Sequence, residues 1–268
     1  MTHLMAIGGA INLAQPRILH EFYRRAGAES AHIVILPTAS ARPDAGQEYA
    51  ELFAQFGLQQ PAKILDVRTR QDALALKING SLWDATGIFI TGGNQGRITA
   101  AIGGTPLEGA LHAALQRGAW IAGTSAGAAV LSAIMLAYGK SGPTPRVGMA
   151  QFTPGLGFSP NILFDQHFRQ RDRIGRLLYA VAAHPGLLGV GVDENTAAIL
   201  EEDTLHVLGS GALTVVDGRD ITATDIADLP SGAPVALAGA RVHTLTEGCR
   251  FHIGTRTPHI PPKILPID

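Results

Sequence analysis

The stretch Ala119-Trp120-Ile121-Ala122-Gly123-Thr124-Ser125-Ala126-Gly127 decides the fold, because an apolar strand pattern ends there in G-x-S-x-G. A helix-forming segment follows, from Ala128 to Leu136. This order is typical of a nucleophile elbow, a turn too tight for a Cβ on either side of the serine. The turn lifts the Ser125 hydroxyl above the start of the helix, whose free N–H groups favour a developing oxyanion. Small residues also pack ordinary strand–helix crossings, so the pentapeptide alone leaves both interpretations open.

Composition predicts one soluble α/β hydrolytic domain over residues 1–268. Hydrophobic residues make up 46% of the chain, and the net charge of −1 gives no basic surplus for nucleic acid. No apolar run reaches the roughly 18 residues of a membrane span. The single cysteine, Cys249, excludes an internal disulfide and a multi-cysteine metal site. We expect no metal, no cofactor, no membrane partner and, because the N-terminus lacks a signal-peptide pattern, a cytoplasmic location.

Strand and helix patterns alternate along the first half of the chain. Strands are expected at His3–Gly8, His32–Pro37, Ala62–Val67 and Gly87–Thr91, and helices at Pro16–Arg25, Pro43–Phe56, Arg70–Asn79 and Pro106–Arg117. This alternation predicts a mostly parallel, doubly wound sheet with helices on both faces. Ligands of such folds bind outside the carboxyl ends of the strands. Gly92-Gly93-Asn94-Gln95 lies at one such end and Ser125 at another.

The second half of the chain has a different sequence pattern, with fewer regularly alternating strands and helices. Leu136–Phe158 is rich in Gly and Pro and is interpreted as an irregular surface loop that could carry an active-site lid. A strand at Asn161–Phe164, a helix at Arg171–Ala183 and strands at Leu187–Val192 and Thr196–Leu200 are expected next. From Thr204 onward, strand and turn patterns predict a β-rich C-terminal part.

A serine nucleophile needs a base, and the base needs an orienting group. Of ten histidines, only His167 lies in a dense polar cluster directly after a strand, within the segment 165–173. Its carboxylate partner is sought at another strand end, where Asp193-Glu194 follows an apolar run. One member of this pair could instead cap the turn, as Asp often does.

Four blocks of sequence together resemble the cyanophycinases. These are serine peptidases of a class-I-glutamine-amidotransferase-like fold, related to aspartyl dipeptidase. The blocks appear in the order and spacing of that family and span most of the chain: Ile90–Gln95, Gly123–Ala128, Asp165–Arg171 and Gly191–Thr196. The resemblance implies Ser125 as nucleophile, His167 as base and Glu194 as third member of the triad. The order serine, histidine, acid counts against an α/β-hydrolase esterase or lipase.

The resemblance also implies a substrate, cyanophycin, which is a poly-aspartate with arginine on each β-carboxyl. We expect a serine exopeptidase that releases β-Asp-Arg dipeptides through an acyl-enzyme on Ser125. By analogy with elbow enzymes, the N–H groups of Gly93 and Ala126 form the oxyanion hole. Substrate contacts are expected from Asn94, Gln95, Asp165, Gln166, Arg171, Arg173 and Arg176.

The arginines are expected at the start of one helix, where they can pair with substrate carboxylates through bidentate contacts. A solvated helix face, with Asp165 and Asp172 as ordinary ion-pair partners, is the alternative. Two positions depart from the family. Ile11-Asn12 stands where an acidic pair is usual, and Asn94 where many relatives have Asp. Both departures bear on the substrate more than on the triad.

Two other functions stay open. An aspartyl or isoaspartyl dipeptidase acting on small acidic peptides would use the same fold, although the arginine cluster and Gln166 disfavour it. A Rossmann-like binding protein could use the Gly-Gly pairs to hold phosphates, but no G-x-G-x-x-G follows the first strand. Family relatives suggest a homodimer.

Overall fold

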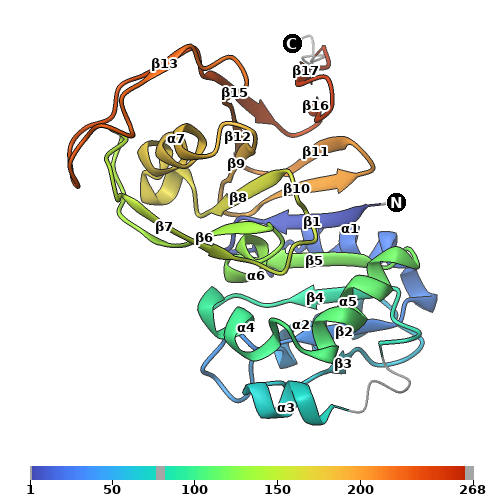
Figure 1. Ribbon diagram of the computed structural model, residues 1–268. Helices are drawn as coiled ribbons and strands as arrows, with labels where there is room; N and C mark the ends of the chain where they lie inside the picture. Colours follow the sequence, from blue (N-terminus) through green and yellow to red (C-terminus); the bar gives the residue numbers. More distant parts are fainter. Residues whose placement is uncertain (1, 77–81, 263–268) are drawn as a thin grey trace.

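The computed structural model describes residues 2–76 and 82–262, and Figure 1 shows their arrangement. The four-stranded sheet and helix α7 occupy the upper part of that view, and strands β2, β3 and β4 the lower part. The helices are α1 (Arg17–Arg25), α2 (Gln47–Gln55), α3 (Arg70–Ala75), α4 (Gln95–Ile102), α5 (Pro106–Gln116), α6 (Ala126–Ala129) and α7 (Ile174–Ala183).

A large mixed sheet organises the described residues. In spatial order its strands are β17 (Thr257–His259), β16 (Arg250–His252), β11 (Thr204–Gly209), β10 (Thr196–Glu201), β1 (His3–Ile7), β5 (Trp120–Thr124), β4 (Gly87–Ile90), β2 (Ile33–Leu36) and β3 (Lys63–Ile64). The pairings from β1 through β5, β4 and β2 to β3 are parallel. Those from β1 through β10, β11 and β16 to β17 are antiparallel. The sheet is therefore mixed, and the prediction of a mostly parallel sheet is not confirmed.

Helices cover both faces of the parallel half. Alternate residues of β1 belong to different buried clusters: Leu4 and Ala6 pack with residues of α4 and α5, whereas Met5 and Ile7 pack with residues of α1 and α2. Since side chains alternate between the faces of a strand, the two clusters lie on opposite faces of the sheet. The predicted doubly wound arrangement thus holds for this half of the sheet.

The second half of the chain builds a smaller sheet beside the first. Its order is β15 (Arg241–Thr246), β12 (Ala212–Asp217), β9 (Leu188–Val192) and β8 (Ile162–Gln166), with β8 and β9 parallel. Two short antiparallel pairs complete the strands: β13 (Ala223–Thr224) with β14 (Leu237–Ala238), and β6 (Ile134–Gly139) with β7 (Ala150–Pro154). The segment Leu136–Phe158, predicted as an irregular loop, therefore contains most of a β-hairpin.

The structure differs from the helix predictions at several places. Helix α6 spans only Ala126–Ala129, because the chain turns at Val130 and enters strand β6, so the predicted helix to Leu136 is too long. Helix α4 was not expected, since Gly96 and Gly103 weaken its pattern. The helix predicted from Arg171 begins at Ile174, after a short 3-10 turn. The predicted helix Arg70–Asn79 is observed as far as Ala75, and its last three residues lie outside the described ranges.

Candidate active site

Ser125 occupies a strained turn between strand β5 and helix α6. Its backbone angles are φ 53° and ψ −112°, in a region that residues with a Cβ rarely adopt. The neighbouring glycines leave no room for side chains. A Cβ at Gly123 would collide with the carbonyl of Gly127, and a Cβ at Gly127 with the carbonyl of Ile90. The sequence G-x-S-x-G is therefore required by close backbone packing on both sides of the serine.

The structure brings Ser125, His167 and Glu194 into a chain of contacts. The Ser125 Oγ lies 2.9 Å from Nε2 of His167, and Nδ1 of His167 lies 2.6 Å from Oε1 of Glu194. His167 follows strand β8 and Glu194 follows strand β9, which run parallel and end at the same edge. His167 itself has a positive φ of 48°. Strained backbone at Ser125 and His167 is of the kind that collects at functional sites.

The end of strand β1 holds these residues together. The Ser125 N–H donates to the carbonyl of Ile7, and the His167 N–H donates to the carbonyl of Gly8, at 2.9 and 2.8 Å. Gly9 lies against the imidazole, since a Cβ there would come within 2.5 Å of His167 Nε2. Sequence reasoning missed Gly9, although the pair Gly8-Gly9 directly after a strand was a signal of close backbone approach.

Gln170 is a second residue that sequence reasoning missed. Its side-chain oxygen accepts a hydrogen bond from the N–H of Glu194 at 3.0 Å, which fixes the loop that carries this carboxylate.

Asp193, the neighbour of Glu194, has a structural role. Its carboxylate accepts the N–H groups of Arg169 and Ala212, at 3.0 and 3.1 Å. Within the pair left open by the sequence, Glu194 contacts the histidine and Asp193 ties neighbouring segments together.

The environment of His167 favours the neutral imidazole. Burial lowers the pKa of His167 below its ordinary value, and the hydrogen bond with Glu194 opposes that shift. The positive charges of Arg171 and Arg173 lower the pKa further. A neutral imidazole with Nδ1–H held by Glu194 leaves Nε2 free to accept the serine proton.

Backbone N–H groups are available beside Ser125. Neither Gly93 nor Ala126 donates its N–H to a backbone carbonyl among the described contacts, and Ala126 opens helix α6. Gly92 adjoins the serine, because a Cβ there would lie 3.2 Å from Ser125 Cβ. Gly93 needs its left-handed φ of 143° and has no space for a Cβ against the carbonyl of Ala39.

Other expected substrate residues make local structural contacts. The side-chain oxygen of Asn94 caps helix α4 by accepting the N–H of Gly96 at 2.8 Å. Asp and Asn cap helices equally well, so Asn in place of the usual Asp preserves this cap. The Gln95 amide donates to the carbonyls of Leu136 and Ala137, at 3.1 and 2.6 Å, and fastens strand β6 to α4.

Ile11 and Asn12, the other departures from the family, make structural contacts of their own, and the expected substrate residue Gln166 contacts the nucleophile. Asn12 caps the turn before α1, where its side-chain oxygen accepts the N–H groups of Ala14 and Gln15. Its own N–H donates to the side chain of Asn195, beside Glu194. Ile11 packs against the buried cluster beneath α1. Among the expected substrate residues, Gln166 makes a contact with the nucleophile, in which its Oε1 lies 3.5 Å from Ser125 Oγ.

The predicted arginine cluster divides into exposed and buried members. Arg171 is exposed, whereas Arg173 and Arg176 are buried and both bind the buried carboxylate of Asp165. Arg176 Nε donates to Asp165 at 2.6 Å, and Arg173 also donates to the carbonyl of Gln166. Burial lowers the pKa of Arg173 to about 10, so it stays charged at neutral pH. These contacts differ from the open helix face expected, because α7 begins at Ile174 and turns Arg176 inward.

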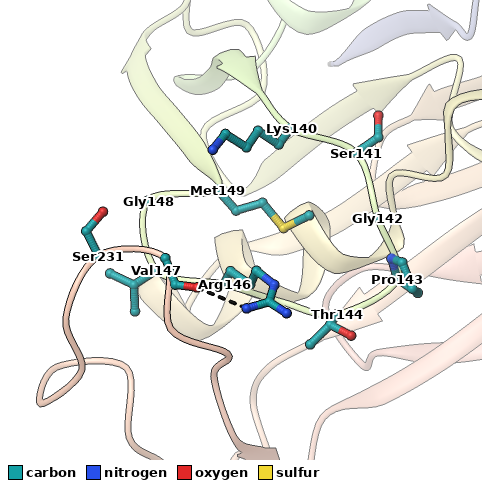
Figure 2. Close-up of a pocket in the computed structure, with 11 residues that line it drawn as sticks. Lys140, Ser141, Gly142, Pro143, Thr144, Arg146, Val147, Gly148, Met149 and Ser231 are labelled. Atoms are coloured by element: carbon teal, nitrogen blue, oxygen red, sulfur yellow. Dashed lines mark hydrogen bonds between the residues drawn. The ribbon is translucent and has the colours of Figure 1, made fainter.

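The hairpin segment expected to carry a lid encloses a cavity of its own (Figure 2). Residues 140–149, between β6 and β7, line about 240 Å³ together with the loop at Ser231 and Gly232. Arg146 donates to the carbonyl of Gly232 at 3.0 Å and closes one side. Gly142 exchanges backbone hydrogen bonds with Asp172 and Gly175, so the segment rests on the start of α7.

Within the described ranges, no cluster of three or more His, Cys, Asp or Glu side chains could hold a metal ion. No helix in the same residues is long and apolar enough to cross a membrane. A serine, a histidine and a glutamate in successive contact on an α/β scaffold are the arrangement of a serine-type hydrolase.

Comparison with known proteins agrees with that class. Residues 4–208 match the model of peptidase family S51. The chain is similar to the cyanophycinase of Trichormus variabilis, with 40% identity over 260 residues, covering 96% of this chain and 87% of the relative. It is 41% identical over 256 residues to the cyanophycinase of Synechococcus elongatus, covering 94% and 79% of the two chains. The chain therefore belongs to peptidase family S51, and the predicted serine-type peptidase is confirmed.

A solved structure is similar in fold. The crystal structure of a peptidase from an acI-B1 Actinobacterium superposes with a TM-score of 0.67 at 22% identity, covering 94% of this chain and 97% of that one. At this identity the likeness concerns the fold alone.

Proposed function

We propose that this chain is an exopeptidase that hydrolyses cyanophycin to β-Asp-Arg dipeptides, with Ser125 as nucleophile. The observation that carries the proposal is the contact series Ser125–His167–Glu194, at 2.9 and 2.6 Å, in a chain about 40% identical to cyanophycinases along most of its length. The strained turn at Ser125, which we interpret as a nucleophile elbow, supports the same chemistry.

In the first half of the reaction, His167 Nε2 takes the hydroxyl proton as Ser125 Oγ attacks an aspartyl carbonyl of the polymer backbone. The tetrahedral oxyanion is stabilised by the N–H groups of Gly93 and Ala126. The imidazolium donates through Nδ1 to Glu194, which stabilises its charge. His167 then returns the proton to the departing amine, the C–N bond breaks and an ester on Ser125 remains.

In the second half, His167 removes a proton from water as the water oxygen attacks the ester carbonyl. The tetrahedral intermediate collapses, the proton returns to Ser125 Oγ and the new carboxylic acid leaves. The lowered pKa of His167 supports this cycle, since the free imidazole is the form that starts each half.

Substrate recognition is proposed from residues that lie near the triad. Arg171 is exposed beside the triad and is suited to a substrate carboxylate. Asn94, Gln95 and Gln166 border the same edge, and Gln166 Oε1 lies 3.5 Å from Ser125 Oγ. Asp165, Arg173 and Arg176 are proposed to act indirectly, because their charged groups bind one another and the backbone of Gln166.

Three broader expectations complete the proposal. A single domain is supported by one buried cluster that includes residues of both sheets, such as Leu4 and Leu213. The glutamine-amidotransferase-like topology rests on the family resemblance. So do a homodimer and a cytoplasmic location, which light scattering and cell fractionation would test.

Incubation of purified protein with insoluble cyanophycin tests the function, with the soluble product identified by mass. Ser125→Ala should lower the rate by many orders of magnitude, about 10⁶ where comparable triads have been disabled. His167→Ala should be nearly as damaging, and Glu194→Gln less so. Ser30→Ala, at an exposed serine, is the matched control and should keep full activity. Rapid cleavage of α-linked Asp-X dipeptides with the polymer untouched would instead support the aspartyl dipeptidase function.

A further inference from the structure

A second cavity lies at the carboxyl edge of the parallel strands, apart from the triad. It has about 310 Å³ and is bordered by residues that follow three neighbouring strands: Thr38 after β2, Asp66 and Arg68 after β3, and Arg97 in the first turn of α4 after β4. In open α/β sheets, ligands bind outside this edge of the strands. None of the catalytic contacts described above uses Thr38, Arg68 or Arg97.

Thr38, which borders this cavity, carries a buried hydroxyl without a hydrogen-bond partner. Thr38 is only 1% exposed, and its Oγ1 has no hydrogen-bond partner among the described residues. An unpaired buried polar group lowers the stability of the fold, so native structures seldom keep one without a use. The Thr38 hydroxyl is therefore placed to donate to a ligand in the cavity.

The charged residues around the cavity leave one guanidinium open. Arg68 is fully engaged: it pairs with Asp66 and donates to the carbonyls of Ser40 and Pro43, at 2.9 and 3.3 Å. Arg97 is exposed, and its side chain makes no hydrogen bond or ion pair within the part of the chain that the structure describes. With Asp66 neutralised by Arg68, the free positive charge of Arg97 makes the cavity suited to an anion.

The cavity is close enough to the triad to take part of the same substrate. Strand β2 lies two strands from β5 in the sheet order, or about 10 Å at the usual strand spacing. The Gly92–Gly93 turn separates the two sites, because Gly92 adjoins Ser125 and Gly93 adjoins Ala39. An extended peptide advances about 3.3 Å per residue, so a group about three residues' length from the scissile bond reaches Arg97.

We propose that Arg97 and Thr38 form a carboxylate subsite that holds a free carboxylate of the bound substrate about 10 Å from the scissile bond. The inference rests on the proposed function, because cyanophycin carries such a carboxylate on every arginine. Arg97 supplies a charge-assisted hydrogen bond, and the Thr38 hydroxyl donates a second one from the floor of the cavity. The subsite complements Arg171, since the buried guanidinium groups of Arg173 and Arg176 bind Asp165.

Steady-state kinetics with two substrates test the subsite: a short cyanophycin segment with free arginine carboxylates, and the same segment with those groups amidated. Arg97→Gln should raise KM for the free form about tenfold or more, with kcat unchanged, and leave KM for the amidated form as it was. Arg97→Lys should restore only part of the loss. Arg250→Gln removes an exposed positive charge at the far side of the sheet and should change neither value. An equal rise in KM for both segments, or none for the free one, would overturn the proposal.

Thr38→Val supplies a variant that separates binding from folding. It should raise KM for the free segment about tenfold, while the melting temperature stays the same or rises, because an unpartnered buried hydroxyl is removed. Thr38→Ser keeps the hydroxyl and should retain the wild-type KM. A fall in melting temperature with KM unchanged in Thr38→Val would show a purely structural threonine.

A binding experiment tests the subsite even if the protein does not cleave the polymer. Calorimetry on the Ser125→Ala variant would use the same short cyanophycin segment in its free and amidated forms as probes. The free form should bind about tenfold more tightly, and addition of Arg97→Gln should remove that difference. Equal binding of the two forms, or none of the free form, refutes the subsite. Absence of cyanophycin turnover by the wild type, with this preference intact, refutes the proposed function alone.

Discussion

Replacing Gly9 by alanine should disable the base without removing any catalytic group. Gly9 has φ 96°, and a Cβ there would lie 2.5 Å from Nε2 of His167. Ordinary contact begins near 3.4 Å, so the imidazole would have to move by about 1 Å, away from the 2.9 Å contact with Ser125 Oγ. A misplacement of about 1 Å at a catalytic group can lower the rate by about 10²-fold, and we expect a fall in kcat of that size.

A second glycine separates this effect from backbone strain. Gly118 has φ 100°, but a Cβ there would meet nothing within 4 Å. Both Gly9→Ala and Gly118→Ala should lose about 1–2 kcal/mol of stability to the left-handed conformation, measured by urea unfolding. Dipeptide release from cyanophycin should fall only for Gly9→Ala. Equal activities of the two variants, or more than about a third of wild-type activity in Gly9→Ala, would refute the reasoning.

Two further predictions concern charges near the base. The kcat/KM of the wild type should fall with decreasing pH through a pKa lowered below 6.5, because only the neutral His167 accepts the serine proton. Arg171→Gln removes a positive charge that lowers this pKa, so it should move the acid limb of the pH profile to higher pH. An acid limb at the same pH in this variant would contradict the charge effect. Asp165→Asn should destabilise the fold by about 3–5 kcal/mol in urea unfolding, since two buried guanidinium groups lose their shared carboxylate. Asp44→Asn, at an exposed pair, should leave the unfolding midpoint unchanged.

The fold could be predicted where hydrophobic pattern and turn residues agree. The parallel strands β1, β2 and β4 lie within the predicted ranges, and β5 extends two residues past its predicted apolar run, because each is a short apolar run bounded by Gly or Pro. Strand pairing could not be predicted in the same way, because it depends on contacts between residues far apart in sequence. The antiparallel partner of β1 is β10, about 190 residues further along, and no local pattern indicates it. The mixed sheet therefore could not be read from the chain.

The site shows the same division. Ser125 could be predicted from its flanking glycines, which the turn requires, and His167 from its position directly after a strand. Burial of Arg173 and Arg176 could not be foreseen, because a sequence does not show how a helix is rotated about its axis. The two arginines are three positions apart, which places both guanidinium groups on one side, and whether that side meets solvent or Asp165 depends on packing against the second sheet.

Gly8 and Gly9 explain why the contact series can form from segments so far apart. Strand β1 lies between β5 and β10, with a parallel neighbour on one side and an antiparallel neighbour on the other. Its carboxyl end therefore lies beside the end of β5, where Ser125 begins, and beside the start of β10, which directly follows the loop of Glu194. His167 binds the Gly8 carbonyl from the smaller sheet and fills the space that the missing side chain of Gly9 leaves. Because any side chain at this junction would separate the base from the nucleophile, the first strand of the chain governs a site whose reacting groups all lie more than a hundred residues later.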